Sequence, residues 1–312
     1  MKFLKSILTT NLTKSLNYLL LGSALLGLST FSRHAEAAAP PKCNSADALG
    51  EKDALGRYHQ RSPSDVAGAL NFCTHTPDRF EITNYELGLC ELPPFTRDRQ
   101  VFNKGEANCT VTMSSSGNTV DIASATVSLP AMSGRPQSGQ YQYAYIIIKN
   151  EFGLKGSITM DDGSGSNPKT FFKYCSDDQG LSSGQTRSCT PQNHTEELDD
   201  FGDSDEELEN QELGYRDFFP TSGDWEDMGN NEGVSALLVK DDLSEAGDRF
   251  ATRKLIGLFK SADNNKVRIT DSTNGLEMQL TVTDIGYGVE FNGNGEPSDF
   301  GSMPFKPVFT TF

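Results

Sequence analysis

Cysteine is the residue type in this chain whose chemistry is clearest from the sequence. Six cysteines occur, at Cys43, Cys73, Cys90, Cys109, Cys175 and Cys189. None of their spacings is the C-x-x-C of a zinc or redox site, and the three histidines after residue 37 lie far from one another. We therefore predict structural disulfides in an oxidising compartment. Many pairings are permitted, and closure between neighbours favours Cys73–Cys90 and Cys175–Cys189, with Cys43–Cys109 remaining.

Carboxylates offer a second kind of chemistry, the binding of a hard cation. Residues 196–232 hold fifteen Asp or Glu residues and a single basic residue, Arg216. Asp199, Asp203 and Asp205 are oxygen donors at close spacing, which the flexible coordination of calcium tolerates. The spacing does not match an EF-hand, and repulsion among like charges favours the alternative, a solvated acidic run without a defined metal site.

A shorter acidic loop has a pattern of its own. Residues 162–166 read Asp-Gly-Ser-Gly-Ser. This loop resembles the D-x-S-x-S motif of von Willebrand factor A domains, where it coordinates a divalent metal that bridges to a carboxylate of a partner. The resemblance implies an adhesion module with Asp162, Ser164 and Ser166 as metal ligands. The mixed strand before the loop departs from that family, and Asp-Gly and Ser-Gly are ordinary turn pairs, so a hairpin turn is the favoured alternative.

Three tyrosines alternate along residues 140–148. In a strand, Tyr141, Tyr143 and Tyr145 would share one face at a pitch of about 7 Å. An exposed row of this kind would stack against sugar rings and bind a glycan. Apolar residues on both faces at the end of the run favour the alternative, a core face whose hydroxyls reach polar partners at its rim.

The sequence contains no catalytic signature that we recognise. It has neither a G-x-S-x-G elbow nor an H-E-x-x-H motif, and no pair of carboxylates stands out. We predict that the protein is not an enzyme and that it uses no cofactor other than calcium at the acidic side chains named above.

Alternation of apolar and polar residues predicts the elements that must position these side chains. The clearest strands are expected at residues 80–87, 140–148, 153–160, 169–175, 234–239, 254–259 and 276–282. Residues 111–113 and 119–122 are expected to form a hairpin with its turn at 114–118. Apolar residues change parity near Asp284, which predicts a bulge or a tight corner there.

These elements predict an all-β fold: a disulfide-stapled antiparallel β-sandwich with a long acidic loop and a C-terminal β segment. Residues 38–192 are expected to supply the main sheets, and residues 193–233 an acidic flexible loop or linker. Residues 234–312 would complete the same sandwich or form a small second lobe, and the sequence leaves both alternatives open.

The first 37 residues have the pattern of a cleaved export signal. Lys2, Lys5 and Lys14 precede and flank an apolar run at 16–28, and Ala35-Glu36-Ala37 is a small-x-small cleavage site. Polar and glycine residues interrupt the run, which suits a short signal better than a permanent membrane span. Cleavage removes four basic residues and one acidic residue, so the net charge changes from −16 to −19.

This charge limits the partners, because a strongly acidic chain repels nucleic acid and anionic lipid. We expect an exported protein, extracellular, at the cell surface or periplasmic, with no membrane span in its mature form. Its expected function is that of a non-enzymatic structural protein of the matrix, fibre-subunit or adhesin type. The expected partner is a cell-envelope component, a glycan or another copy of the chain. The alternatives are a glycan-binding module that uses the tyrosine row and a calcium-dependent adhesion module.

Overall fold

The structure is a computed structural model. It describes residues 42–43, 58–59, 72–96, 99–123, 134–161, 169–172, 193–198, 215–219, 233–246, 249–262, 264–292, 295–303 and 305–312. These residues form strands joined by loops, together with one short 3-10 turn, η2 (Arg249–Ala251). None of them belongs to a helix that is long and apolar enough to cross a membrane.

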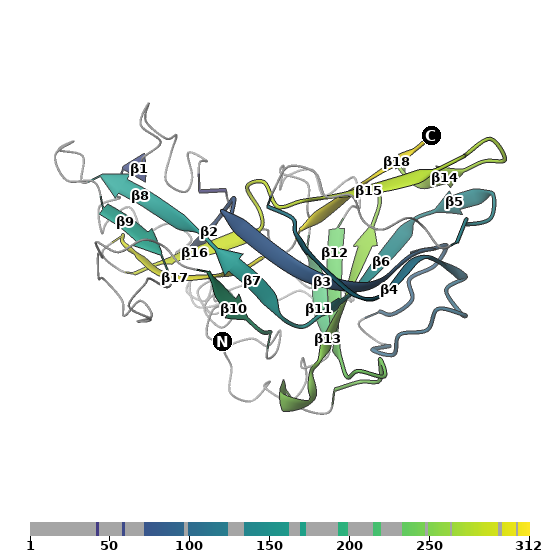
Figure 1. The fold of residues 1–312 in the computed structure, drawn as a ribbon, viewed down its shortest axis with the longest axis horizontal. Coiled ribbons are helices and arrows are strands. Elements are labelled where there is room, and N and C mark those ends of the chain that lie inside the picture. The colour runs from purple at the N-terminus through teal and green to yellow at the C-terminus, as the bar shows by residue number, and fades with distance from the viewer. Residues whose placement is uncertain are drawn as a thin grey trace, which may run out of the picture.

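One large antiparallel sheet contains eight strands (Figure 1). In spatial order its main path is β10 (His194–Glu196), β7 (Phe152–Lys155), β3 (Arg79–Cys90), β6 (Tyr143–Lys149), β13 (Lys254–Lys260), β12 (Gly233–Val239) and β11 (Tyr215–Phe219). Strands β7 and β6 pair with successive parts of one edge of β3, and the eighth strand, β4 (Cys109–Asp121), pairs with the other edge. Strands from both sides of the acidic segment therefore share one sheet, since β6 pairs with β13 along its whole length.

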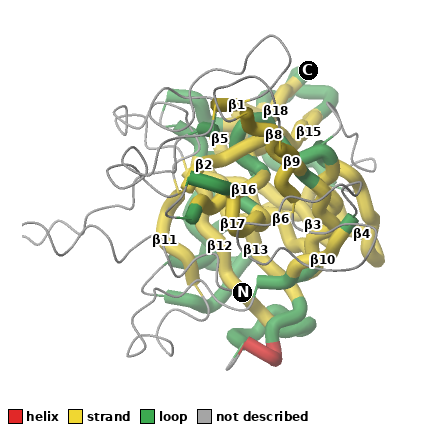
Figure 2. The backbone as a smooth tube through the Cα atoms, turned by 90° about the vertical axis from the view of Figure 1, so that its left-hand side faces the viewer, coloured by secondary structure: helices red, strands yellow, loops and turns green. Residues whose placement is uncertain are grey.

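Four smaller sheets accompany the large one. They are formed by β1 (Tyr58–His59), β8 (Ser157–Asp161) and β9 (Lys169–Phe172); by β2 (Phe72–His75), β16 (Tyr287–Phe291) and β17 (Pro297–Ser302); by β5 (Gly139–Tyr141) and β14 (Val267–Ile269); and by β15 (Leu276–Thr281) and β18 (Lys306–Thr311). Figure 2, seen from the end that carries β1, β8 and β9, shows these three strands together with β2, β16 and β17 on the side nearest the viewer. The predicted all-β, antiparallel fold class is confirmed.

Strand β6 explains why the large sheet has a core on both faces. Neighbouring side chains of a strand point to opposite faces. Ala144, Ile146 and Ile148 belong to one buried cluster, whereas Tyr145 and Ile147 belong to a second. Burial of each of the three isoleucine side chains contributes about 1.5–3 kcal/mol to the free energy of unfolding. Strand β6 accordingly lies inside the sheet, between β3 and β13.

The tyrosine row is interrupted at Gln142, where the chain changes partners. Tyr141 ends β5 and pairs with β14, whereas Tyr143 begins β6 and pairs with β13. As a result Tyr141 lies in the first buried cluster, and Tyr143 and Tyr145 lie in or against the second. The expectation that the three rings share one face is wrong, because it assumed an unbroken strand.

The hairpin predicted around residues 114–118 is also wrong, because β4 is a single strand that pairs with β3 from Cys109 to Asp121. Its Ser-Ser-Ser-Gly-Asn run forms a bulge in which three residues lie opposite Tyr85. Ser115 Oγ donates to the Asn84 carbonyl at 2.6 Å, and Gly117 has a φ of 118°. Pairing with β3 therefore keeps within a strand a polar run whose sequence resembles a turn.

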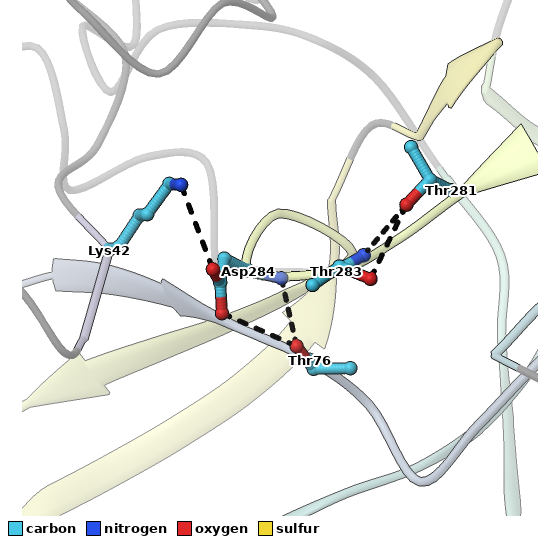
Figure 3. Close-up of polar contacts among 5 residues, drawn as sticks. All are labelled: Lys42, Thr76, Thr281, Thr283 and Asp284. Atoms are coloured by element: carbon cyan, nitrogen blue, oxygen red, sulfur yellow. Dashed lines mark hydrogen bonds and ion pairs between the residues drawn. The ribbon is translucent and has the colours of Figure 1, made fainter. Parts of the chain in front are cut away.

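The parity change near Asp284 is confirmed as a tight corner between β15 and β16. Asp284 has a φ of 62°, and the Ile285 and Gly286 amides donate to the Val282 carbonyl. Its amide donates to Thr76 Oγ1 at 2.8 Å, and its carboxylate lies 3.6 Å from Lys42 Nζ (Figure 3). This polar contact joins the corner to residues near β2.

Two short strands lie within the stretch that the sequence analysis assigned to an acidic loop, residues 193–233. β10 pairs with β7, and β11 pairs with β12. Buried Asn150 holds the chain just after β10, because its side-chain amide donates to the Leu198 carbonyl at 2.7 Å and accepts from the Leu198 amide at 3.1 Å. The rest of the stretch lies outside the described residues.

Candidate functional site

The two disulfides of the described residues join Cys43 to Cys73 and Cys90 to Cys109. The predicted pairs Cys73–Cys90 and Cys43–Cys109 are therefore wrong. Cys90 and Cys109 lie directly opposite each other in the β3–β4 pairing, with a Cα–Cα distance of 4.0 Å. Both observed bonds join cysteines that are consecutive in the sequence, but the strand register of β3 against β4, rather than the shortest loop, decides that Cys90 pairs with Cys109. Cys175 and Cys189 lie outside the described residues.

The Cys90–Cys109 bond closes a loop of residues 91–108, which we call the closed loop. The Leu92 amide donates to the Ala107 carbonyl at 3.2 Å, and the Asn103 amide donates to the Pro94 carbonyl at 2.9 Å. Asn103 Oδ1 also accepts from two amides that follow it in the chain, both at 3.1 Å. Internal hydrogen bonds and a covalent neck hold the described parts of this loop, residues 91–96 and 99–108, in a defined conformation.

The inner side of the closed loop covers the second face of the large sheet. Phe95 and Ala107 are each 1% exposed and belong to the cluster that contains Tyr145. The ring of Phe102 meets the ring of Tyr145 edge to face, with 5.1 Å between centroids. The loop is therefore part of the core on this face, and its packing fixes the position of the residues it exposes.

The outer side of the closed loop displays two apolar side chains to solvent. Leu92 is 53% exposed and Val101 is 60% exposed. Arg99 forms an ion pair with Glu106 on the same surface. Over residues 91–108 the chain has three basic and three acidic side chains, in a protein whose net charge is −16. The closed loop is thus a surface of balanced charge that exposes two apolar side chains, within a strongly acidic protein.

A half-buried carboxylate anchors the loop to the sheet. Glu86 Oε1 accepts from Tyr145 Oη at 2.7 Å and from Lys104 Nζ, in the loop, at 2.8 Å. Burial of the Tyr145 ring raises the pKa of its hydroxyl far above the ordinary value of 10, and the bond to the Glu86 carboxylate and its negative charge raise that pKa further. Phenolate formation would place two negative charges side by side in the core.

We expect this group to make the protein sensitive to alkali. Because the pKa of Tyr145 is raised in the folded state, its contribution to stability is complete below about pH 10 and falls as the pH rises above that value. At neutral pH, Tyr145→Phe should lower the free energy of unfolding by about 1.5–3 kcal/mol, the usual effect of a hydrogen bond to a charged group.

Urea unfolding of both proteins at several pH values from 7 to about 11 checks this expectation. The difference between Tyr145→Phe and the wild type should shrink above pH 10, because phenylalanine does not ionise. A difference that stays constant across the series would show that Tyr145 does not carry the alkaline sensitivity.

The other predicted site residues fall in different places. Tyr141 and Tyr145 are 3% and 1% exposed, and Tyr143 is half-buried, so they do not form an exposed row. The candidate metal ligands Asp162, Ser164, Ser166, Asp199, Asp203 and Asp205 lie outside the described residues. Within the described residues, no three His, Cys, Asp or Glu side chains are grouped so as to hold a metal ion.

Sequence reasoning missed the closed loop because the decisive facts are tertiary. Its signals were present, in two cysteines that flank a Pro-Pro and Gly-containing segment next to a predicted strand. Nothing in the sequence distinguishes the buried Phe95 from the exposed Leu92, which lies three residues earlier.

Comparisons with protein-family models, with curated proteins and with solved structures find no match to the chain.

Proposed function

We propose that this chain is an exported, non-enzymatic binding protein of the adhesin type, in which the closed loop contacts a protein of the cell envelope. The observation that carries this proposal is the fixed display of Leu92 and Val101 on a loop closed by a disulfide and packed onto the core. Loops of fixed conformation on a rigid β scaffold commonly carry recognition.

Physical arguments support the loop as the contact surface. A binding loop that is already ordered loses little conformational entropy when it meets a partner. Removing exposed apolar side chains from water at an interface is favourable, and Leu92 and Val101 are among the most exposed large apolar residues of the described chain. The balanced charge of the loop avoids the repulsion that the rest of this acidic protein exerts on acidic surfaces.

Two features support an extracellular setting. The disulfides of the described residues persist in oxidising compartments and are rare in the cytosol. Residues 1–37 have the composition of an export signal. An envelope protein is favoured over a second copy of the chain as partner, because two copies would bring two strongly negative molecules together.

A double variant tests the proposal. Leu92→Ser combined with Val101→Ser should reduce binding of the purified protein to envelope preparations of its source organism by about tenfold or more, because each change removes an apolar side chain from the contact. Sedimentation of labelled protein with the preparation measures the bound fraction.

The matched control is Val308→Ser, which changes an exposed apolar residue on β18 that is 44% exposed. It should bind like the wild type. Equal binding by the double variant and the wild type would overturn the proposal. If sizing shows that the wild type is an oligomer and the double variant is a monomer, the loop contacts a second copy and the proposed partner is wrong.

A further inference from the structure

A second surface, lined by none of the residues of the closed loop, has the form of a small-molecule site. A pocket of about 370 Å³ lies between residues 134–136, which precede β5, residues 273–276 at the start of β15, and Phe312 after β18. In Figure 1 these strands come together near the C-terminal end of the drawn chain. The volume falls in the range of about 300–1,000 Å³ that is usual for small-ligand sites.

The pocket has an apolar floor and an exposed aromatic ring. Ile269 and Pro136 are buried beneath it, and Leu276 is half-buried. Phe312 is 68% exposed, yet its position is fixed. Its amide and carbonyl pair with those of Gly275, and a Cβ on Gly275 would lie 2.2 Å from the ring, so the ring rests on the glycine backbone. One side of the ring is supported and the rest remains open to solvent.

Polar groups stand at the rim of the pocket. Arg135 Nη2 donates to the Thr270 carbonyl at 2.7 Å, and its Nε donates to the Thr273 carbonyl at 3.4 Å. These bonds orient the guanidinium and leave its Nη1 without a protein acceptor among the described residues. Within the same part of the chain, no carboxylate forms an ion pair with Arg135, and the exposed Asn274 side chain has no hydrogen bond. The rim therefore offers fixed donors that are available to a ligand.

We infer that this pocket binds a neutral saccharide. A sugar ring has an apolar C–H face, which suits the exposed Phe312 ring, and a rim of hydroxyls, which suits Arg135 and Asn274. A purely apolar ligand would cover these donors without replacing their bonds to water, which is unfavourable.

Charge selects a neutral ligand over an ionic one. Arg135 at the rim repels a cation at short range. An anion meets the carboxylate of Asp271, which is held near the rim by a bond of 2.6 Å from Ser138 Oγ, and approaches a protein whose net charge is −16. A neutral glycan avoids both penalties and still satisfies the donors.

A glycan array that carries neutral oligosaccharides of glucose, galactose, mannose and N-acetylglucosamine, together with uronic-acid oligosaccharides, tests the inference with the full chain. We expect retention on neutral sugars. Calorimetric titration with the best neutral ligand should then show about tenfold weaker binding by Phe312→Ala, because the stacking surface is lost. Asn274→Ala, which changes an exposed side chain, should also weaken binding.

Val308→Ala is the matched control, since it changes an exposed apolar residue of the same C-terminal strand outside the pocket. It should bind the sugar like the wild type, as should the closed-loop variant Leu92→Ser with Val101→Ser, so that failure here is distinguishable from failure of the proposed function. No retention on neutral sugars, a preference for the uronic acids, or unchanged affinity in both Phe312→Ala and Asn274→Ala would overturn the inference.

Discussion

Replacing Gly88 by alanine should lower the free energy of unfolding by about 3 kcal/mol, at the upper end of what one added methyl group usually causes in a core. A Cβ at this position would lie 2.3 Å from the Tyr145 ring, which crosses Gly88 from the neighbouring strand. The ring has nowhere to move, because it is bonded to Glu86 and packed against Phe102. Alanine also reduces the conformational entropy of the unfolded chain, which is a small stabilising effect, and the clash outweighs it.

A double-mutant cycle isolates this contact. Tyr145→Ala alone should lower the free energy of unfolding by about 3–5 kcal/mol, and Gly88→Ala added to it should cause almost no further loss, because the obstructing ring is gone. Gly139→Ala is the matched control, since a Cβ there would meet its nearest atom at 3.8 Å, an ordinary contact. Urea unfolding of the wild type and the four variants measures these effects. Equal effects of Gly88→Ala and Gly139→Ala would contradict the expected clash.

The strands that sequence reasoning located well are those whose pattern survives in any context. β12 and β13 carry apolar residues that must be buried, and the chain places both strands within one residue of their predicted bounds. Asp284 illustrates the same point for a corner, because the parity change is a local property of the sequence.

Failures of prediction arise where a partner strand overrides local preference. Residues 114–118 have turn chemistry, but β3 on one side supplies hydrogen bonds that keep β4 extended through a bulge. The tyrosine alternation fails at Gln142, because β5 and β6 pair with different strands. In both cases the deciding contact is between residues that are distant in the sequence, and a single sequence does not show which strands are neighbours.

The candidate site was hidden for the same reason. The cysteines were recognised, but their pairing depends on the register of β3 against β4, and only that register makes residues 91–108 a closed loop. The exposure of Leu92 and Val101 follows from the packing of Phe95 and Ala107 on the sheet beneath. Sequence patterns predicted no element at residues 91–108, and their role as a display surface follows from tertiary structure.

Removing the Cys90–Cys109 bond should have two separable effects. Cys90→Ala with Cys109→Ala should lower the free energy of unfolding by about 3 kcal/mol, because the bond closes a segment of 19 residues in the unfolded chain. It should also release the neck of the closed loop, so that the Leu92 and Asn103 amides exchange with solvent much faster. Binding through the closed loop should also weaken, because a loop that is disordered in the free protein would lose conformational entropy when it binds.

The second disulfide provides the control that separates these effects. Cys43→Ala with Cys73→Ala opens a segment of 30 residues and should lower the free energy of unfolding by a similar amount, about 3–4 kcal/mol. It lies outside the closed loop, so the exchange of the Leu92 and Asn103 amides should not change beyond the general loss of stability. Hydrogen exchange of both variants under native conditions measures the difference. If the two variants speed exchange in the closed loop equally, the Cys90–Cys109 bond stabilises the whole protein but does not order the loop. The closed loop would then not be a preorganised binding surface.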